Sequence, residues 1–237
     1  MPKSQLISDL KSEITSCTDC PRLRRYCLKM AQTKRKAYAG EEYWGKPITG
    51  FGDPNPARVK LLIVGLAPAA HGANRTGRIF TGDRSGDWLY RALHKAGYAN
   101  QPTSTHRRDG LQLRKTYITC VVKCAPPDNK PSPVELKRCT HYLEDEIALF
   151  ENTRVFLALG QIALAGLWPI LVRNGLTLTQ TRPHFSHGGE TKLTEKKSLL
   201  LSYHPSQQNT FTGRLTEPMF DSVFDRASKL IEVSSSL

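Results

Sequence analysis

Six cysteines are the residues of this sequence whose type and spacing most directly suggest chemistry. Four of them fall into two groups that are far apart in the chain: Cys17, Cys20, Cys124 and Cys139. A C-x-x-C pair occurs in zinc, iron–sulfur and redox sites, so Cys17 and Cys20 alone are only moderately informative. Four thiolates together could hold a tetrahedral zinc ion or a [4Fe–4S] cluster, and the spacing does not decide between them. We expect the two that remain, Cys27 and Cys120, to be small buried hydrophobic side chains.

A glycine-rich stretch, residues 65–83 (GLAPAAHGANRTGRIFTGD), could bring its backbone close to a ligand. It follows the apolar run 59–64, which is typical of a buried parallel strand. Open α/β sheets bind ligands at the carboxyl ends of such strands. A nucleotide-binding loop would need G-x-G-x-x-G or G-K-S/T, and this stretch has neither. A purely structural turn between a strand and a helix is the alternative interpretation.

The elements that must position these residues alternate between strands and helices. Four apolar runs have the length of buried strands: residues 59–64, 117–122, 155–159 and 198–202. Helical spacing occurs in residues 4–15, 85–97, 161–171 and 217–233, and a basic helix follows Cys20. Ser132 before Pro133, with Glu135 in the first turn, predicts the start of another helix. The alternation predicts an α/β fold, a three-layer α/β/α sandwich around a central four-stranded parallel sheet.

We expect a single domain over residues 1–237, in which residues 1–56 form an N-terminal arm. Within this arm, residues 34–56 are predicted to be an ordered connection to the first strand. Residues 98–115 are predicted to be a loop, too polar to belong to the core. We expect the last four residues, 234–237, to be a loose end.

His204 lies at the carboxyl end of the last predicted strand, two residues after Ser202. Its imidazole should therefore lie at the same edge of the sheet as the glycine-rich stretch. The sequence has seven histidines, so a histidine alone means little, and the position is what makes His204 a candidate.

The charge balance favours a polyanionic partner. The chain has 34 Lys and Arg against 21 Asp and Glu, a net charge of +13, which is typical of proteins that bind nucleic acid or a membrane surface. No apolar run approaches membrane-spanning length, and the first residues lack the apolar core of a signal peptide. We therefore expect a cytoplasmic protein without a membrane partner, whose cysteines are reduced or bound to metal rather than paired in disulfides.

Three segments together resemble the uracil-DNA glycosylase superfamily, and specifically its family 5 (type B) branch. They are GLAPAAHG with NRTGR-x-FTGD, VVKCAPPDNKPSP, and LSYHPSQQNTFTGR, in that order and covering nearly the whole chain. The resemblance implies a monofunctional DNA-repair glycosylase, which flips uracil out of DNA and hydrolyses its N-glycosidic bond to start base excision repair. It also implies that the two cysteine groups hold a structural [4Fe–4S] cluster, which ties the arm to the sheet.

The same resemblance implies roles for individual residues. His204 would donate a hydrogen bond to O2 of the departing uracil, while Asp83 and Asn129 would orient water or stabilise the sugar cation. Superfamily members commonly have a polar residue where this chain has Leu66 or Ala69. The residues expected to bind the base, with Phe80 stacking on it, are Gly65, Leu66, Ala67, Ala69, Ala70, Phe80 and Cys120. Those expected to form a loop that enters the duplex are Ser206, Gln207, Gln208 and Asn209.

Cys120 bears on which bases are accepted. The related family 4 enzymes have an asparagine in an ITNVVKC context, and this chain reads ITCVVKC, with Cys120 in place of the amide. A thiol is a weak donor and acceptor, so it cannot read two atoms of a base edge. We therefore expect hypoxanthine and xanthine to be excised as well as uracil.

Two other classes of function stay open on the sequence alone. A non-catalytic, metal-bearing nucleic-acid module would explain the charge and the C-x-x-C pair, but not the candidate pocket residues. A cofactor-dependent α/β enzyme is disfavoured because both glycine fingerprints are absent. The expected partner is uracil-containing DNA, in double-stranded and also single-stranded form, and we expect the protein to be a monomer.

Overall fold

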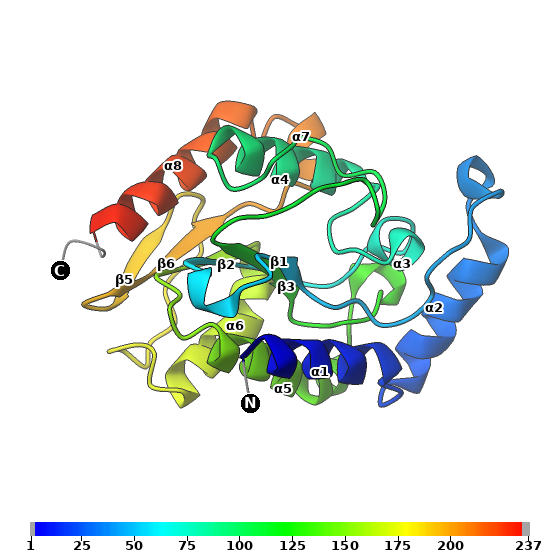
Figure 1. Cartoon of the computed structure of the whole chain (residues 1–237), viewed down its shortest axis with the longest axis horizontal. Helices are drawn as coiled ribbons and strands as arrows, with labels where there is room; N and C mark the ends of the chain where they lie inside the picture. The colour runs from blue at the N-terminus through cyan, green and yellow to red at the C-terminus, as the bar shows by residue number, and fades with distance from the viewer. Residues whose placement is uncertain (1–2, 234–237) are drawn as a thin grey trace.

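A six-stranded sheet forms the middle layer of the structure, a computed structural model described over residues 3–233 (Figure 1). Its strands are β1 (Phe51–Gly52), β2 (Leu61–Gly65), β3 (Thr116–Cys120), β4 (Val155–Leu159), β5 (Glu190–Thr194) and β6 (Lys197–Ser202). Their order across the sheet is β1-β3-β2-β4-β6-β5. The four inner strands are parallel, and β1 and β5 join antiparallel at the two edges.

The inner strands confirm the predicted α/β sandwich with four parallel strands, but the sheet is wider than expected. Strand β1 has only two residues, and β5 alternates between exposed and less exposed positions. Neither strand is an apolar run, because an edge strand need not be buried on both faces. The apolar pattern that marks buried strands is therefore absent from β1 and β5.

Helices cover both faces of the sheet. The α-helices are α1 (Lys3–Ser16), α2 (Pro21–Thr33), α3 (Ala73–Thr76), α4 (Arg84–Lys95), α5 (Pro133–Leu149), α6 (Gln161–Arg173), α7 (Gln207–Phe211) and α8 (Glu217–Val233). Helices α4 and α8 lie above the sheet in Figure 1, and α1, α5 and α6 lie below it. Each layer buries its own apolar cluster against the sheet, so the core has two halves. No helix in the described part of the chain is long and apolar enough to span a membrane.

The predicted helix start at Ser132 is confirmed in detail. The Ser132 hydroxyl accepts a hydrogen bond from the Glu135 backbone N–H at 3.3 Å, and the Glu135 carboxylate accepts one from the Ser132 N–H at 2.7 Å. This reciprocal capping box begins α5. Helix α5 in turn carries Cys139 into the core.

The loop prediction for residues 98–115 is correct for secondary structure but wrong about the core. Apart from a single bridge between Ala99 and Leu113, this segment has no strand pairing in the described structure. Leu111 and Leu113 are nevertheless buried, and so is the side chain of Asp109. Asp109 is buried because its carboxylate pairs with the buried guanidinium of Arg78. The predicted loose end, 234–237, lies outside the described residues.

Candidate active site

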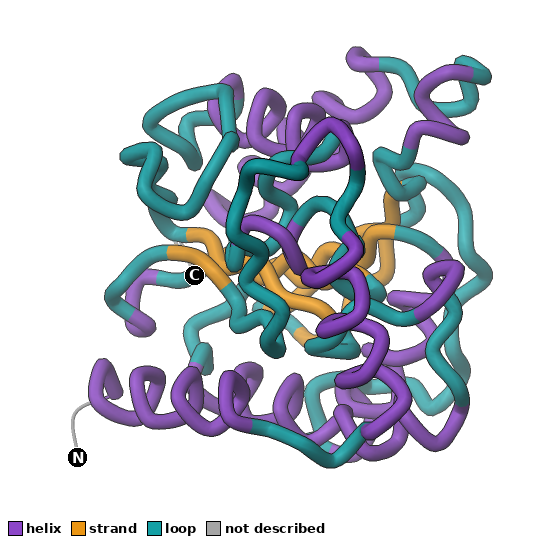
Figure 2. Tube along the Cα trace, turned by 90° about the vertical axis from the view of Figure 1, so that its right-hand side faces the viewer, coloured by secondary structure: helices purple, strands orange, loops and turns teal. Residues whose placement is uncertain are grey.

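Figure 2 turns toward the viewer the side of the molecule where α3 lies, and loops and short helices gather there. The carboxyl ends of the parallel strands meet at this edge. Gly65, the last residue of β2, stands beside Cys120, the last residue of β3, in the parallel register. A Cβ atom on Gly65 would lie 3.1 Å from both Cys120 Sγ and the Phe80 ring. A side chain at position 65 would crowd both neighbours, so Gly65, Cys120 and Phe80 form one contiguous surface.

Phe80 and His204 come together above that surface. Their ring centroids are 5.7 Å apart with the planes inclined by 31°. Phe80 has a φ of +50°, an uncommon conformation for a large side chain. The Tyr90 hydroxyl donates to the carbonyl of the preceding residue, Ile79, at 2.9 Å, and so helps to fix this backbone. Strained residues of this kind occur most often where a ligand must be positioned.

His204 is prepared to act as a neutral donor. Burial lowers the pKa of its imidazole to about 4, so the ring is uncharged at neutral pH. The His204 carbonyl accepts from the Ser206 backbone N–H and the Asn209 side-chain amide, both at 2.8 Å. Its ring nitrogens have no hydrogen-bond partner among residues 3–233, which leaves an N–H available to a ligand.

The loop between β2 and α3 supplies further donors. Within the described chain, the backbone N–H groups of Ala67, Ala69 and Ala70 have no hydrogen-bond acceptor. The loop is fixed from outside, because the Leu66 carbonyl accepts from the Val122 N–H at 2.9 Å. Free backbone donors in a fixed loop can stabilise negative charge that develops on a ligand.

Asp83 lies at the other side of this loop. It caps α4, its carboxylate accepting from the Gly86 N–H at 3.0 Å. Burial raises the pKa of this carboxyl despite that hydrogen bond. A Cβ atom on Gly72 would come within 1.9 Å of Asp83 Oδ2, so the carboxylate rests directly on the glycine-rich stretch. Asp83 also lines a cavity of about 540 Å³, together with Arg75 and Gly82 of the same stretch.

Two of the sequence-based expectations look different in the structure. Asn129 is exposed in a 3₁₀ turn with a φ of +55°, and no hydrogen bond joins its side chain to another candidate residue in the described chain. The segment expected as a loop after His204 is helical, with Ser206 capping α7. Gln207 and Gln208 lie exposed in its first turn, whereas Asn209 turns back to the His204 carbonyl.

Two functional candidates, Phe211 and Lys123, are absent from the sequence-based set. Phe211 at the end of α7 is 67% exposed, which is unusual for an aromatic side chain, and the Arg84 guanidinium covers its ring at 4.8 Å. Lys123 is fully buried and pairs with Glu146 at 2.6 Å. It also donates to the Cys120 carbonyl at 3.0 Å, directly beneath the pocket. Lys123 could have been recognised in the sequence, because it is a charged residue at the end of the apolar run 117–122. The exposure of Phe211 could not, because no local pattern indicates it.

The four cysteines of the two separated groups converge below the sheet. They are Cys17 and Cys20 between α1 and α2, Cys124 after β3, and Cys139 in α5. All are free thiols. Cys20 interacts electrostatically with Cys17 and Cys124, and Cys139 with Cys20 and Cys124. Burial raises the pKa of Cys20 to about 11 and that of Cys139 to about 12, so deprotonation here would need a bound cation.

The geometry does not match a single metal ion. Among residues 3–233, no three side chains of the His, Cys, Asp or Glu type are close enough to hold one ion. The Lys123 backbone N–H donates to Cys139 Sγ at 3.2 Å, a contact of the kind that orients metal-binding thiolates. Cys27, predicted to be a buried hydrophobe, is indeed buried and points its thiol at the Ala125 carbonyl, 3.6 Å away. Cys120 is buried as well, but in the pocket wall.

Comparison with known proteins agrees with this arrangement. A profile described as the uracil DNA glycosylase superfamily matches residues 51–227, so the chain belongs to that superfamily. A type-5 uracil-DNA glycosylase of Mycobacterium leprae is 49% identical and covers 94% of this chain and 95% of its own length. Proteins of the same name from Thermus thermophilus and Pyrobaculum aerophilum are 46% and 40% identical, covering 92% and 93% of this chain and 94% and 91% of their own lengths.

Proposed function

We propose that this protein is a uracil-DNA glycosylase, which hydrolyses the bond between uracil and deoxyribose in DNA and so begins base excision repair. The observation that carries the proposal is the approach of the Phe80 ring to the neutral His204 imidazole, with ring centroids 5.7 Å apart, at the sheet edge where the glycine-rich stretch begins. Relatives called type-5 uracil-DNA glycosylase match over nearly the whole chain, which supports it.

The residues divide the reaction between them. The uracil, flipped out of the duplex, stacks on Phe80. As the glycosidic bond breaks, negative charge develops on O2 of the base. His204 donates its N–H to this oxygen, and the N–H groups of Ala67, Ala69 and Ala70 add to the stabilisation. A neutral imidazole can donate in this way without releasing its proton.

The departing base leaves a cationic sugar, which water must attack. Asp83 is the carboxylate of the glycine-rich stretch, and its oxygens can accept hydrogen bonds from that water and orient it. Asn129 would need a change in its surroundings on DNA binding to serve the same purpose, because it is exposed in the free protein. We assign Asp83 the larger part.

The proposed specificity is broad. Cys120 is buried in the pocket wall beside Gly65, where burial raises the pKa of its thiol to about 12. A neutral thiol reads a base edge poorly, and a pocket that relies on shape discriminates less than one that relies on hydrogen bonds. Hypoxanthine and xanthine are therefore proposed as further substrates.

We also propose that Cys17, Cys20, Cys124 and Cys139 hold a [4Fe–4S] cluster. The donor set fits, because these four free thiols gather in one part of the core and four cysteine thiolates are the ligands of a cubane cluster. When bound, the cluster supplies a covalent link between the arm, residues 1–56, and the sheet. The arm would thereby join the rest of the chain in one domain.

The proposed contacts with DNA centre on α7. Gln207 and Gln208 face solvent beside His204, and Phe211 is an exposed aromatic side chain of the type that wedges between base pairs. We propose that α7 enters the space left by the flipped base. The protein would act as a monomer in the cytoplasm, on double-stranded and single-stranded DNA.

The test is a panel of duplexes that contain uracil, hypoxanthine, xanthine or only normal bases, with alkali-labile strand breaks as the readout. Wild-type protein should cleave the three deaminated substrates and leave normal DNA intact. The variant Cys120→Asn introduces a second edge-reading group and should narrow the range toward uracil. Strict uracil selectivity in the wild type would refute the proposed breadth, and no cleavage of any substrate would refute the activity.

A further inference from the structure

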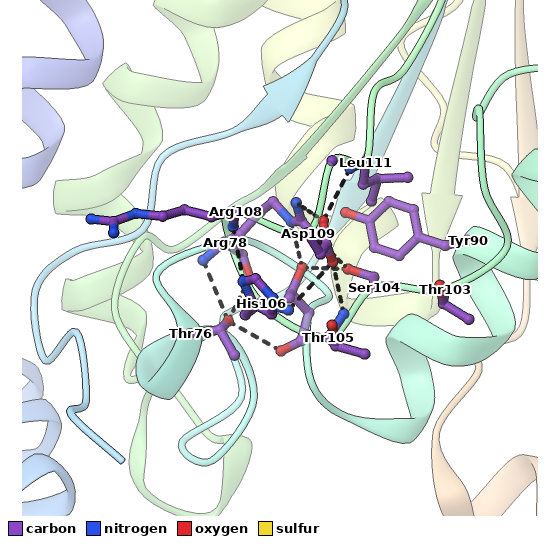
Figure 3. A network of polar contacts seen from close by, with 12 residues as sticks. Thr76, Arg78, Tyr90, Thr103, Ser104, Thr105, His106, Arg108, Asp109 and Leu111 are labelled. Carbon is purple, nitrogen blue, oxygen red and sulfur yellow. Dashed lines mark hydrogen bonds and ion pairs between the residues drawn. The ribbon is translucent and has the colours of Figure 1, made fainter.

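The loop between α4 and β3 is anchored to the glycine-rich stretch by a buried polar network (Figure 3). Arg78, 5% exposed, donates two hydrogen bonds to the Asp109 carboxylate at 2.8 and 2.6 Å. The same guanidinium donates to the hydroxyls of Thr81 and Ser104, each at 2.9 Å. The Gly82 backbone N–H completes the anchor with a bond of 2.9 Å to the Ser104 carbonyl.

Asp109 also shapes the loop from within. Its carboxylate accepts from the backbone N–H groups of Thr105 at 2.9 Å, His106 at 3.3 Å and Leu111 at 3.0 Å. This exposed tip of the loop, residues 105–108, is therefore held in one conformation by a carboxylate that is itself fixed to Arg78. Such preorganisation lowers the entropic cost of binding a ligand.

The loop tip carries two exposed arginines. His106, Arg107 and Arg108 are exposed, and neither arginine pairs with a carboxylate within residues 3–233. In Figure 3 the Arg108 side chain extends away from the network. The Arg107 guanidinium lies over the Trp44 ring, 4.7 Å from its centroid. A cation stacked on an aromatic ring keeps its hydrogen-bond donors free for another ligand.

The platform under Arg107, the Trp44 ring, packs on the glycine-rich stretch. A Cβ atom on Gly77 would lie 3.0 Å from the Trp44 ring, so Trp44 packs flat on the glycine-rich stretch. Lys46 approaches the same ring at 5.5 Å. The cavity that Asp83 lines is also lined by Ser104, Thr105 and His106. A DNA strand whose nucleotide reaches Asp83 would thus pass along the loop tip.

We propose that the tip, residues 105–108, is a second DNA-binding element in which Arg107 and Arg108 contact phosphates of the strand that carries the damaged base. This inference rests on the proposed function and adds a binding site to it. Guanidinium groups suit phosphate oxygens because their donors form a planar fork. The Arg78–Asp109 anchor links this phosphate contact to the backbone around Phe80 and Asp83, which sets the distance between the bound strand and the pocket.

The experiment compares Arg107→Ala/Arg108→Ala with the wild type in binding a duplex that carries a stable abasic-site analogue, across a range of NaCl concentrations. The double variant should bind roughly tenfold more weakly at low salt. The slope of log affinity against log salt should fall by about 0.9 for each lost phosphate contact.

The matched control is Arg173→Ala/Lys192→Ala, which also removes two positive charges. Arg173 ends α6 and Lys192 pairs in register with the start of β6, so both lie at the opposite edge of the sheet. The proposal is overturned if the loop variant keeps the wild-type affinity and slope, or if the control lowers both equally. Absence of uracil excision in the wild type would instead count against the proposed function, while the salt slopes would still test the loop.

Discussion

At the scale of single residues, the site depends on a histidine kept neutral by its surroundings. Desolvation by burial lowers the pKa of His204 to about 4, and no charged group among residues 3–233 contributes to this shift. A neutral ring suits a donor to developing negative charge, because it stabilises the transition state while paying little desolvation penalty in the resting enzyme.

We expect His204→Ala to slow uracil excision by roughly a hundred- to a thousandfold, the usual effect of losing one such donor. Affinity for a duplex with an abasic-site analogue should change little, since the imidazole lies inside the pocket. Single-turnover kinetics and fluorescence anisotropy measure the two quantities separately. An unchanged excision rate would remove His204 from the mechanism.

The same residue predicts a pH dependence of stability. The pKa of His204 falls from its ordinary 6.5 to about 4 on folding, so the unfolded chain binds the proton more tightly. Its contribution to folding is therefore complete above pH 6.5 and is lost as the pH falls toward 4. His204→Gln should flatten the fall in the free energy of unfolding over this range. Urea denaturation at several pH values measures the difference, and parallel curves for the two proteins would contradict it.

At the scale of elements, the sequence could predict what is encoded locally. The inner strands are continuous apolar runs, and Ser132, Pro133 and Glu135 lie next to one another in the chain, so both could be recognised. The position of His204 at the sheet edge followed from the strand before it. The pairing of Arg78 with Asp109 could not be predicted, because 31 residues separate them and no local pattern joins them. The helical form of α7 was missed because it is short and follows a proline.

The Arg78–Asp109 pair should matter for stability as well as for the loop. Burial would raise the pKa of Asp109, but hydrogen bonds from Arg78 and from the Leu111 and Thr105 amides lower it to about 2. The carboxylate thus stabilises the fold above its ordinary pKa of 3.8, and this contribution is lost as the pH falls through about 2. Asp109→Asn leaves the buried guanidinium without its counterion and should cost roughly 3 kcal/mol at neutral pH.

Chemical denaturation of Asp109→Asn measures that loss. Glu195→Gln is the matched control, because Glu195 pairs with Lys192 on the surface, where both side chains are largely exposed. Its effect should stay below about 1 kcal/mol. If the two substitutions lowered the free energy of unfolding equally, burial of the Arg78–Asp109 pair would add nothing to stability.

At the scale of the whole molecule, the arm and the sheet are joined in more than one way. Arg22 donates to the Glu135 carboxylate in α5 at 2.8 and 2.7 Å, and Arg138 donates to the Asp19 carbonyl at 2.8 Å. The Asn74 side chain donates to the Cys27 carbonyl of α2 at 3.2 Å. These contacts surround the cysteines, so ordering of the arm and binding of a cluster should reinforce each other.

We therefore expect purified protein to be brown and to contain about four irons per chain, as a [4Fe–4S] cluster requires. Cys139→Ala should lose most of the iron and unfold at lower temperature, because the arm loses its covalent link. Cys27→Ala, the matched substitution of a neighbouring cysteine, should keep its iron. Metal analysis of anaerobically prepared protein measures the iron content per chain. Zinc in place of iron would exclude the cluster.

The charge of the entire chain predicts how binding responds to salt. A net charge of +13 gives the protein a positive field that attracts DNA before any specific contact forms. Each phosphate neutralised by Lys or Arg releases counterions, so log affinity for an undamaged duplex should fall linearly with log salt, by about 0.9 per contact. With several contacts the loss between low and physiological salt should exceed tenfold, whereas the excision rate of already bound substrate should stay nearly constant. Titrations by anisotropy measure the slope and single-turnover kinetics the rate. A flat response of affinity to salt would show that the positive surface serves something other than DNA.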